Sequence, residues 1–442
     1  MAHHLELPVW TVLPFVGLLL SIAILPLAAP HFWESNRNKG SVAALFGVPV
    51  ALYLLVAHGA GGLHELEEKA KEYVSFILLL ASLFVVTGGI FVRGSLSGTP
   101  LVNTGLLGLG ALLASWIGTT GASVLLIRPL LRANATRQRT AHIVVFFIFT
   151  VSNCGGLLTP LGDPPLFLGF LKGVPFGWTL GLWREWLVVN GALLVIFNVW
   201  DQRVLAAEER ARPGAQLEDV MRHLPLGVAG KRNFFFLAAL VAVIYAAGQG
   251  LGNAGEPWPF GVQEALMALV TGLAFAVTPH RIRAANSFGF GPIIEVAVLF
   301  AGIFVTMAPA LLLLNANAGR FGLEEPWQFF WAAGLLSSFL DNAPTYLTFA
   351  ATACGLDGIA LEGRYLGEYL ALGPRAAETL AAISVGAVFM GANTYIGNGP
   401  NFMVKAIAEE NSVRMPSFFG YMAYSGAVLI PLFVAVTWLF FG

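Results

Sequence analysis

Long apolar stretches separated by short polar segments run through the whole chain. A stretch of about 20 apolar residues is long enough to cross a bilayer as a helix, and ten stretches are interpreted as full spans. They cover residues 8–30, 41–58, 74–92, 141–171, 182–200, 233–250, 262–279, 292–314, 377–409 and 417–441. The pattern therefore predicts an all-α polytopic membrane protein with about ten spans.

Two further apolar segments do not fit as single spans. Residues 94–127 are too long for one crossing and carry polar residues at their middle, and residues 327–353 carry Asp341 at theirs. Arg93 precedes the first segment and Arg128 follows it, so both of its ends are expected on the same side of the membrane. We predict that both segments are re-entrant hairpins.

The distribution of basic residues predicts the orientation of the spans. With both termini outside, 17 of the 24 Lys and Arg residues fall on the cytoplasmic side, as the positive-inside rule requires. Residues 201–232 then form a sizeable cytoplasmic loop between two halves of the chain. Residues 1–40 form a leading span and loop, residues 41–200 form repeat one, and residues 233–442 form repeat two. The expected location is the cell inner membrane.

The two halves resemble each other around their hairpins. Each hairpin is followed by a span interrupted by Gly, Pro and Asn, 141–171 in the first half and 377–409 in the second. The segment Leu-Gly-Asp ending at Asp163 aligns with the segment Ile-Gly-Asn ending at Asn398. In the predicted topology the first hairpin opens inward and the second opens outward, so the repeats are inverted. Inverted repeats with paired interrupted spans are typical of secondary transporters.

Composition narrows the range of functions. The chain is 57% hydrophobic and 11% charged, with a formal net charge of −1. A near-neutral chain gives no support for a nucleic-acid partner, and a chain this poor in charge is expected to be surrounded by lipid. The sequence contains no Walker A loop, zinc-ligand pair or nucleophile elbow. We therefore expect neither an enzyme nor a cofactor, and the expected partners are the lipid bilayer and small ions.

Chemistry is expected where helices break at membrane depth. Backbone N–H and C=O groups cannot be left bare in hydrocarbon, so such breaks face protein or water, where free backbone groups can bind small ions. Four breaks are predicted, at residues 115–123, 152–165, 338–345 and 393–401. The predicted ion- or substrate-binding residues in them are Thr119, Thr120, Ser152, Asn153, Thr159, Asp163, Asp341, Asn342, Thr345, Asn393 and Asn398. The expected ligands of Na⁺, as transported or coupling ion, are Asn153, Asp163, Asn342 and Asn393.

Three acidic residues are candidate proton carriers. An ionisable group at membrane depth is a functional hypothesis by default. Asp341 follows an apolar run and is expected to be the main carrier, because Asp163 lies beside two prolines and has a turn to cap. Glu295 begins another apolar run and is the third candidate. One acid that binds either a proton or Na⁺ is the minimal chemistry of antiport.

These motifs resemble those of the ion-transporter superfamily. They are Thr-Thr-Gly-Ala-Ser at 119–123, Ser-Asn-Cys-Gly-Gly at 152–156, Gly-Asp-Pro-Pro at 162–165, Leu-Asp-Asn-Ala-Pro-Thr at 340–345 and Gly-Asn-Gly-Pro-Asn at 397–401. The superfamily includes NhaD-type sodium/proton antiporters, arsenite permeases, the pink-eyed-dilution melanosomal protein and citrate or dicarboxylate carriers. Within it, the chain is most similar to bacterial sodium:proton antiporters. The resemblance implies an inverted-repeat fold with two hairpins, a homodimer and an elevator-type movement.

Three functions remain open at this point. Na⁺/H⁺ antiport is favoured by the acids at membrane depth and by the lack of an obvious arginine cluster for an anion. The alternative is Na⁺-coupled uptake of citrate or another organic or inorganic oxyanion such as arsenite, with helix N-termini receiving the anion. The Ser-Asn-Thr triplet that dicarboxylate carriers place at each hairpin tip is missing here, which weakens this alternative. A passive channel or structural membrane protein is the third, and the inverted repeats argue against it.

Overall fold

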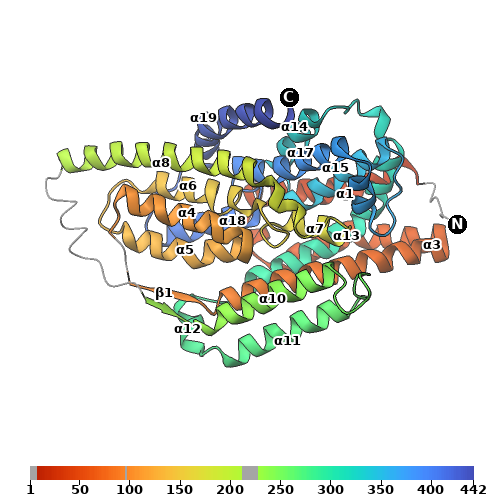
Figure 1. Ribbon diagram of the computed structural model, residues 1–442, viewed down its shortest axis with the longest axis horizontal. Helices are drawn as coiled ribbons and strands as arrows, with labels where there is room; N and C mark the ends of the chain where they lie inside the picture. Colours follow the sequence, from red (N-terminus) through yellow and green to blue (C-terminus); the bar gives the residue numbers. More distant parts are fainter. Residues whose placement is uncertain (1–6, 95–96, 212–226) are drawn as a thin grey trace.

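The fold is built almost entirely of helices (Figure 1). The computed structural model describes residues 7–94, 97–211 and 227–442. In this described part, seven helices are long and apolar enough to cross a membrane, and three further apolar helices are shorter. The all-α polytopic membrane fold predicted from the sequence is therefore confirmed. The start of the predicted segment 1–40 and the middle of the predicted loop 201–232 lie outside the described residues.

Repeat one and the segment before it contain eight α-helices among the described residues. They are α1 (Leu13–Ala28), α2 (Pro30–Trp33), α3 (Asn36–Thr87), α4 (Pro100–Ile117), α5 (Thr119–Ala133), α6 (Ala141–Thr150), α7 (Pro164–Leu171) and α8 (Trp183–Ala211). Short 3-10 turns are η1 (Val9–Val12), η2 (Cys154–Leu157) and η3 (Trp178–Leu182). The strand β1 (Phe91–Arg93) pairs antiparallel with β2 (Gly227–Ala229), with Phe91 opposite Ala229.

The second half of the chain is also built almost entirely of helices. Its helices are α10 (Arg232–Gly248), α11 (Val262–Val277), α12 (His280–Ala285), α13 (Gly291–Ala316), α14 (Pro326–Ser337), α15 (Asn342–Leu356), α16 (Tyr365–Ala371), α17 (Pro374–Met390), α18 (Gly399–Glu410) and α19 (Phe418–Val436). The 3-10 turns η4 (Ala318–Arg320) and η5 (Gly391–Asn393) and the π-helical turn η6 (Thr437–Phe441) complete it.

Helix α3 contains the predicted span 41–58 and residues 74–87 of the predicted span 74–92, whose end lies outside the helix and reaches β1. The helical conformation is interrupted at Gly59, whose φ of 53° is a left-handed value that glycine adopts without a steric penalty. A Cβ atom on Gly62 would lie 2.0 Å from the carbonyl oxygen of Leu54, so the chain turns sharply here. One long assigned helix therefore accounts for two apolar arms.

The predicted segment 94–127 forms a helical hairpin. Its two helices, α4 and α5, pack against each other and are joined at Gly118, where φ is 79°. Near the other end, Nδ2 of Asn103 donates to Oδ1 of Asn134 at 2.9 Å, so the start of α4 and the end of α5 meet. The structure differs from the prediction in one detail, because α5 continues to Ala133 and Arg128 lies inside it. In the second half, α14 and α15 pack together in the same way, with a break at residues 338–341.

The two interrupted spans are split into half-helices. The first consists of α6 and α7, separated by a non-helical segment that includes η2, and the second consists of α17 and α18, separated by η5. Every residue from His142 to Thr150 in α6 is buried, as are most residues of α17. A helix that is apolar all round belongs in the interior of a protein. The broken spans therefore lie inside the molecule, where their free backbone groups can be satisfied.

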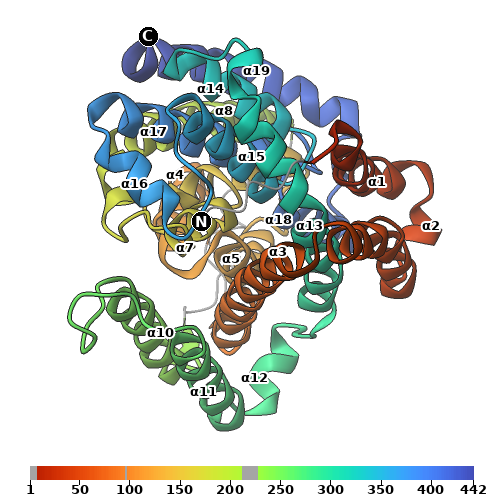
Figure 2. The same ribbon diagram turned by 90° about the vertical axis from the view of Figure 1, so that its right-hand side faces the viewer.

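The helices form two neighbouring groups (Figures 1 and 2). Helix α3 packs mainly against α13, and α10 and α11 pack against α3 and each other along one edge of the molecule. The hairpins and the broken spans form the other group, in which α18 packs on α5 and α15 packs on α7. These last two contacts each join repeat one to repeat two. The breaks of both repeats consequently meet in one place.

Candidate functional site

Asp163 and Asn398 occupy matching positions in the two broken spans. Asp163 directly precedes α7 and Asn398 directly precedes α18, and both helices have proline at their second residue. Their backbones are also alike, with φ/ψ of −142°/144° at Asp163 and −152°/140° at Asn398. Neither side chain caps its own helix. Both side chains are therefore available for contacts with other elements.

The carboxylate of Asp163 is bound by side chains from both repeats. Its Oδ1 accepts hydrogen bonds from Oγ1 of Thr119 at 2.9 Å and from Nδ2 of Asn398 at 3.2 Å. Its Oδ2 accepts a hydrogen bond from Nδ2 of Asn342. Asp163 is 1% exposed. All three of these donors are neutral, and no Lys, Arg or His among the described residues forms an ion pair with this carboxylate. When this carboxyl is ionised, only the dipoles of neutral groups stabilise its charge.

Helix N-termini also contribute to the electrostatic potential at Asp163. Thr119 and Asn342 are the first residues of α5 and α15, and Asp163 and Asn398 stand immediately before α7 and α18. The N-terminus of a helix carries a partial positive charge and stabilises anions within its first turn. The short helix α7 contributes less than the others because its macrodipole is small. This arrangement favours a negative charge at Asp163, from the protein or from a ligand.

A second group of amide side chains continues the site away from Asp163. Nδ2 of Asn398 also lies 3.2 Å from Oδ1 of Asn153, and Nδ2 of Asn153 donates to Oδ1 of Asn401 at 2.7 Å. The hydroxyl groups of Ser123 and Ser152 are 2.8 Å apart. All of these residues are fully or almost fully buried. The polar groups of the two repeats therefore form one connected network.

Two of the three buried amide oxygens that have no hydrogen-bond partner among the described residues lie at the breaks. These two are Oδ1 of Asn342, beside Asp163, and Oδ1 of Asn393 in the second broken span, and the third is Oδ1 of Asn190 on α8. A buried acceptor without a partner costs free energy, and such groups in native proteins call for an explanation, such as an ion. Within the described residues, no group of three or more His, Cys, Asp or Glu side chains gathers as a metal site. Carboxylate, amide and hydroxyl oxygens are hard ligands, which fit Na⁺ better than a transition metal.

The structure places the other predicted site residues around this network rather than in it. Oγ1 of Thr159 donates to the carbonyl oxygen of Ser115, and Oγ1 of Thr345 donates to the carbonyl oxygen of Asp341 at 2.9 Å. Thr120 lines the cavity described below. Asn393 donates from Nδ2 to Oγ of Ser338 at 2.9 Å. These four side chains support the breaks and do not touch Asp163.

The two remaining acidic candidates have different surroundings from Asp163. Asp341 is half-buried and caps α15, because its Oδ1 accepts a hydrogen bond from the backbone N–H of Ala343 at 3.0 Å. Glu295, on α13, forms an ion pair with Lys39 at 2.7 Å. The expectation that the side chain of Asp163 caps a turn is wrong, and Asp341 is the acid that caps a helix. Pro164 and Pro165 have no N–H group to offer Asp163, whereas Ala343 has one.

Matching contacts in the two repeats identify residues that the sequence analysis missed. Oγ1 of Thr394 donates to the carbonyl oxygen of Ser338 at 2.5 Å, just as Thr159 donates to Ser115. The alignment that pairs Asp163 with Asn398 also pairs Thr159 with Thr394, so Thr394 was within reach of the sequence. Asn401 was also missed, although it follows Asn398 by one turn of helix in the same Gly-Asn-Gly-Pro-Asn motif.

A small cavity borders the carboxylate. It has a volume of about 70 Å³ and lies between the tip of the first hairpin at Thr119, the break of the first interrupted span at Asp163, and side chains of α3 and α13 such as Phe84 and Val296. One water molecule occupies about 30 Å³ in the liquid. The cavity therefore has room for a small ion or about two water molecules. It lies where the two groups of helices meet.

Broken helices from both halves of the chain meet around a buried carboxyl group, an arrangement typical of secondary transporters. Over residues 3–441 the chain matches the model of a family described as "Putative citrate transport", and it belongs to that family. A search of curated proteins found no match to the chain. The family confirms the predicted class of secondary transporter. The closer resemblance to NhaD-type antiporters and arsenite permeases stays a prediction.

Proposed function

We propose that this protein is a cation-coupled carrier of citrate or a closely related carboxylate, with the coupling cation bound at Asp163. The observation that carries the proposal is the buried carboxylate of Asp163, which is held by three neutral donors from both repeats. The description of the family supports citrate as the cargo. Na⁺ is the proposed coupling ion, and a proton is the other cation that a carboxylate can bind.

The need for a cation follows from the burial of Asp163. An isolated charge inside a protein is costly unless it is paired or neutralised. Hydrogen bonds from Thr119, Asn342 and Asn398 lower this cost but leave the net charge in place. A cation beside the carboxylate removes the net charge, and the unpartnered oxygen of Asn342 is an additional ligand for it. Binding of the cation is therefore coupled to the charge state of the whole site.

The cargo requires more room than the cavity beside Asp163 provides. Pockets for small organic ligands are typically about 300–1,000 Å³, whereas this cavity is about 70 Å³. The hairpins and broken spans must therefore separate from α3 and α13 before a carboxylate anion can enter. Once open, the N-termini of α5 and α15 offer N–H groups to the anion. A bound cation assists this step because it cancels the repulsion between Asp163 and an anionic cargo.

Sodium/proton antiport is the second candidate, and one observation favours it. No basic side chain touches the Asp163 network in the described part of the chain, so the site has no fixed positive charge for an anion with several carboxylates. A single carboxylate that exchanges a proton for Na⁺ needs no such charge. In this case Asp163 alone carries out the exchange and no organic cargo is moved.

Transport by the purified protein in proteoliposomes separates these candidates. Uptake of radiolabelled citrate is measured with an inward Na⁺ gradient, with an inward proton gradient and with neither. A pH-sensitive dye in parallel vesicles reports proton movement when Na⁺ is added. We expect uptake of citrate to require a cation gradient and to be lost in Asp163→Asn. The matched control is Asp357→Asn, which makes the same change at an exposed residue after α15.

The outcomes are distinct. Citrate uptake that needs no gradient, or that persists in Asp163→Asn, contradicts the proposed coupling site. Absence of citrate uptake together with a dye response to Na⁺ supports antiport instead. Absence of both activities in the wild-type protein contradicts both candidates.

A further inference from the structure

A second cavity shares no lining residue with the cavity beside Asp163 and is strongly basic. It has a volume of about 680 Å³ and is formed by the segment between α5 and α6, the C-terminal part of α8, and the loop that follows α18. Its lining includes Arg132, Arg137, Arg139 and Arg414, and none of its described lining residues is Asp or Glu. Three of these arginines come from one short segment and the fourth comes from the other repeat.

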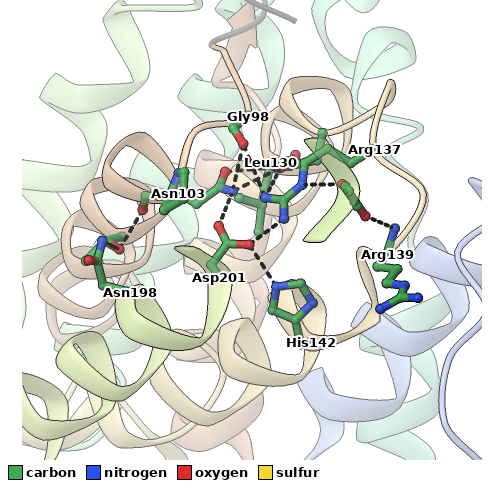
Figure 3. Close-up of polar contacts among 12 residues, drawn as sticks. Gly98, Asn103, Leu130, Arg137, Arg139, His142, Asn198 and Asp201 are labelled. Carbon is green, nitrogen blue, oxygen red and sulfur yellow. Dashed lines mark hydrogen bonds and ion pairs between the residues drawn. The ribbon is translucent and has the colours of Figure 1, made fainter. Parts of the chain in front are cut away.

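A buried cluster fixes one wall of this cavity (Figure 3). Nη2 of Arg137 lies 2.7 Å from Oδ1 of Asp201, which also accepts a contact of 2.8 Å from Nε2 of His142. Oδ2 of Asp201 accepts a hydrogen bond from Nδ2 of Asn103 at 3.1 Å. Asp201 and Glu208 compensate the charge of Arg137. Arg137 therefore positions the segment and is not available as a ligand-binding group.

The other three arginines keep their positive charge. Arg132 donates from Nη2 to the carbonyl oxygen of Val92 at 2.7 Å, a neutral acceptor that leaves the charge intact. The backbone N–H of Arg139 donates to Glu208 at 2.7 Å, while its guanidinium group points away from Asp201 (Figure 3). Arg132, Arg139 and Arg414 are all exposed residues. This cavity therefore attracts anions.

An apolar groove continues from the basic cavity along the outer surface of α8. It has a volume of about 610 Å³ and is lined by Val195, Ile196 and Val199, with Arg203 beside them. The two hollows share Arg139, Trp200 and Val204. Val195 is 64% exposed and Val199 is 45% exposed, so the described part of the chain does not cover this face of the helix. A basic cavity that runs into an apolar groove fits a ligand with an anionic head and an apolar tail.

The position of this site along α8 corresponds to the membrane interface. Helix α8 starts at Trp183, and Trp200 follows about 26 Å further along the helix axis at 1.5 Å per residue. The hydrocarbon core of a bilayer is about 30 Å thick. Trp183 and Trp200 therefore sit near opposite interfaces, where tryptophan is enriched. In the predicted topology the interface at Trp200 and Arg203 is the cytoplasmic one.

We propose that this composite site binds an anionic phospholipid of the cytoplasmic leaflet. The phosphate group binds Arg139 and Arg414 in the cavity, and an acyl chain lies along Val195 and Val199. Arginine suits phosphate because its planar guanidinium group donates two parallel hydrogen bonds. Basic cytoplasmic residues also act as simple topology anchors. Residues that only anchor the topology do not have to line one cavity, however. Here, arginines from both repeats line the same cavity.

The position of the lipid gives it a mechanical role. Arg139 precedes α6 and Arg414 follows α18, and these helices belong to the two broken spans that meet near Asp163. A phosphate group that binds both arginines links the two repeats at their membrane edge. Bound lipid therefore stabilises the arrangement of the two repeats seen here.

Lipid binding to the detergent-purified protein tests the proposal. Native mass spectrometry measures binding of phosphatidylglycerol, of phosphatidylcholine and of inorganic phosphate to the same preparations. We expect phosphatidylglycerol to bind more tightly than phosphatidylcholine. In Arg139→Gln/Arg414→Gln its affinity falls roughly thirty-fold, because each arginine contributes about a factor of five near an anionic lipid. Val199→Asn, which changes no charge, also weakens binding of the lipid.

The control variant is Arg93→Gln/Arg281→Gln. It removes the same charge from two exposed residues on the predicted cytoplasmic side that line neither hollow, and we expect its affinity to match the wild-type protein. Equal loss of affinity in both double variants shows unspecific attraction and overturns the proposed site. Inorganic phosphate that binds as tightly as phosphatidylglycerol overturns the lipid as its occupant.

Discussion

Asp163 and Asp201 are two acidic residues with almost no exposed surface, at 1% and 0%, and with very different neighbours. Asp201 contacts Arg137 and His142, so its charge is balanced within the protein. Asp163 contacts only hydroxyl and amide groups. The comparison shows that burial does not by itself mark a functional acid. The missing positive partner at Asp163 supports the proposed cation-binding role there, whereas Asp201, on α8, connects α4, α6 and the segment before α6.

The largest effect is expected from removing the charge of Asp201. Asp201→Asn leaves Arg137 without its main counter-charge in a buried position, and breaking such a pair costs about 3–5 kcal/mol. We expect a loss of this size in the free energy of unfolding, measured by denaturant titration in detergent. Asp357→Asn, at an exposed position, should change stability by less than about 0.5 kcal/mol. Equal stability of the two variants would remove the distinction between the two buried acids.

Asp163→Asn should show the opposite pattern. The substitution removes a buried charge that has no charged partner, so we expect stability in the absence of Na⁺ to be equal to that of the wild-type protein or higher. Transport should fall by roughly two orders of magnitude, since an interaction with a charged group contributes about 1.5–3 kcal/mol. Thermal unfolding in NaCl and in choline chloride provides the second measurement. Only the wild-type protein should be stabilised by Na⁺, because a ligand stabilises the state that binds it.

A smaller effect is expected from removing one donor to Asp163. Thr119→Val keeps the shape of the side chain but removes the hydroxyl group that donates to Oδ1. The affinity for the coupling cation should fall about tenfold, which corresponds to the lower end of the range for a hydrogen bond to a charged group. The adjacent variant Thr120→Val is the control, because Thr120 lines the cavity without contacting the carboxylate. A similar loss in both variants would point to packing rather than to the hydrogen bond.

The smallest effect is expected at Asp341. Asp341→Asn retains an N-cap for α15, because asparagine and aspartate cap helices equally well. Stability should therefore change by only a few tenths of a kcal/mol, and cation-coupled transport should continue. Uptake assays in proteoliposomes check this directly. Loss of transport in a stable Asp341→Asn protein would restore Asp341 as the main proton carrier, as its sequence context suggests.

The sequence located the breaks of the site because their signal is local. Pro and Gly interrupt apolar runs near Asp163 and Asn398, and such interruptions are visible without any knowledge of packing. The relative roles of Asp163 and Asp341 were harder to predict. Two prolines suggested a turn for Asp163 to cap, but the same prolines remove the N–H groups that capping needs. Which of the two acidic side chains caps a helix depends on whether a backbone N–H group is available beside it.

The cluster around Asp201 lay beyond the reach of the sequence. His142 lies in the predicted span 141–171, and Asp201 lies at the start of the predicted cytoplasmic loop 201–232. Their contact joins residues 59 positions apart, and no periodic pattern reports a pairing of that kind. The basic cavity shows the same limit, because Arg414 and Arg139 come together only through the packing of both repeats.

The matched positions of Asp163 and Asn398 also have an electrical consequence. The pair contributes one ionisable group, because one half of the chain carries a carboxyl where the other carries an amide. Under the proposed function, a monovalent cation or a proton on Asp163 makes this pair neutral, and the ionised pair without it carries a charge of −1. Moving one elementary charge across 100 mV changes the free energy by about 2.3 kcal/mol. The membrane potential is then expected to act on this pair only while it is empty, and on a carboxylate cargo through the charge of the cargo itself.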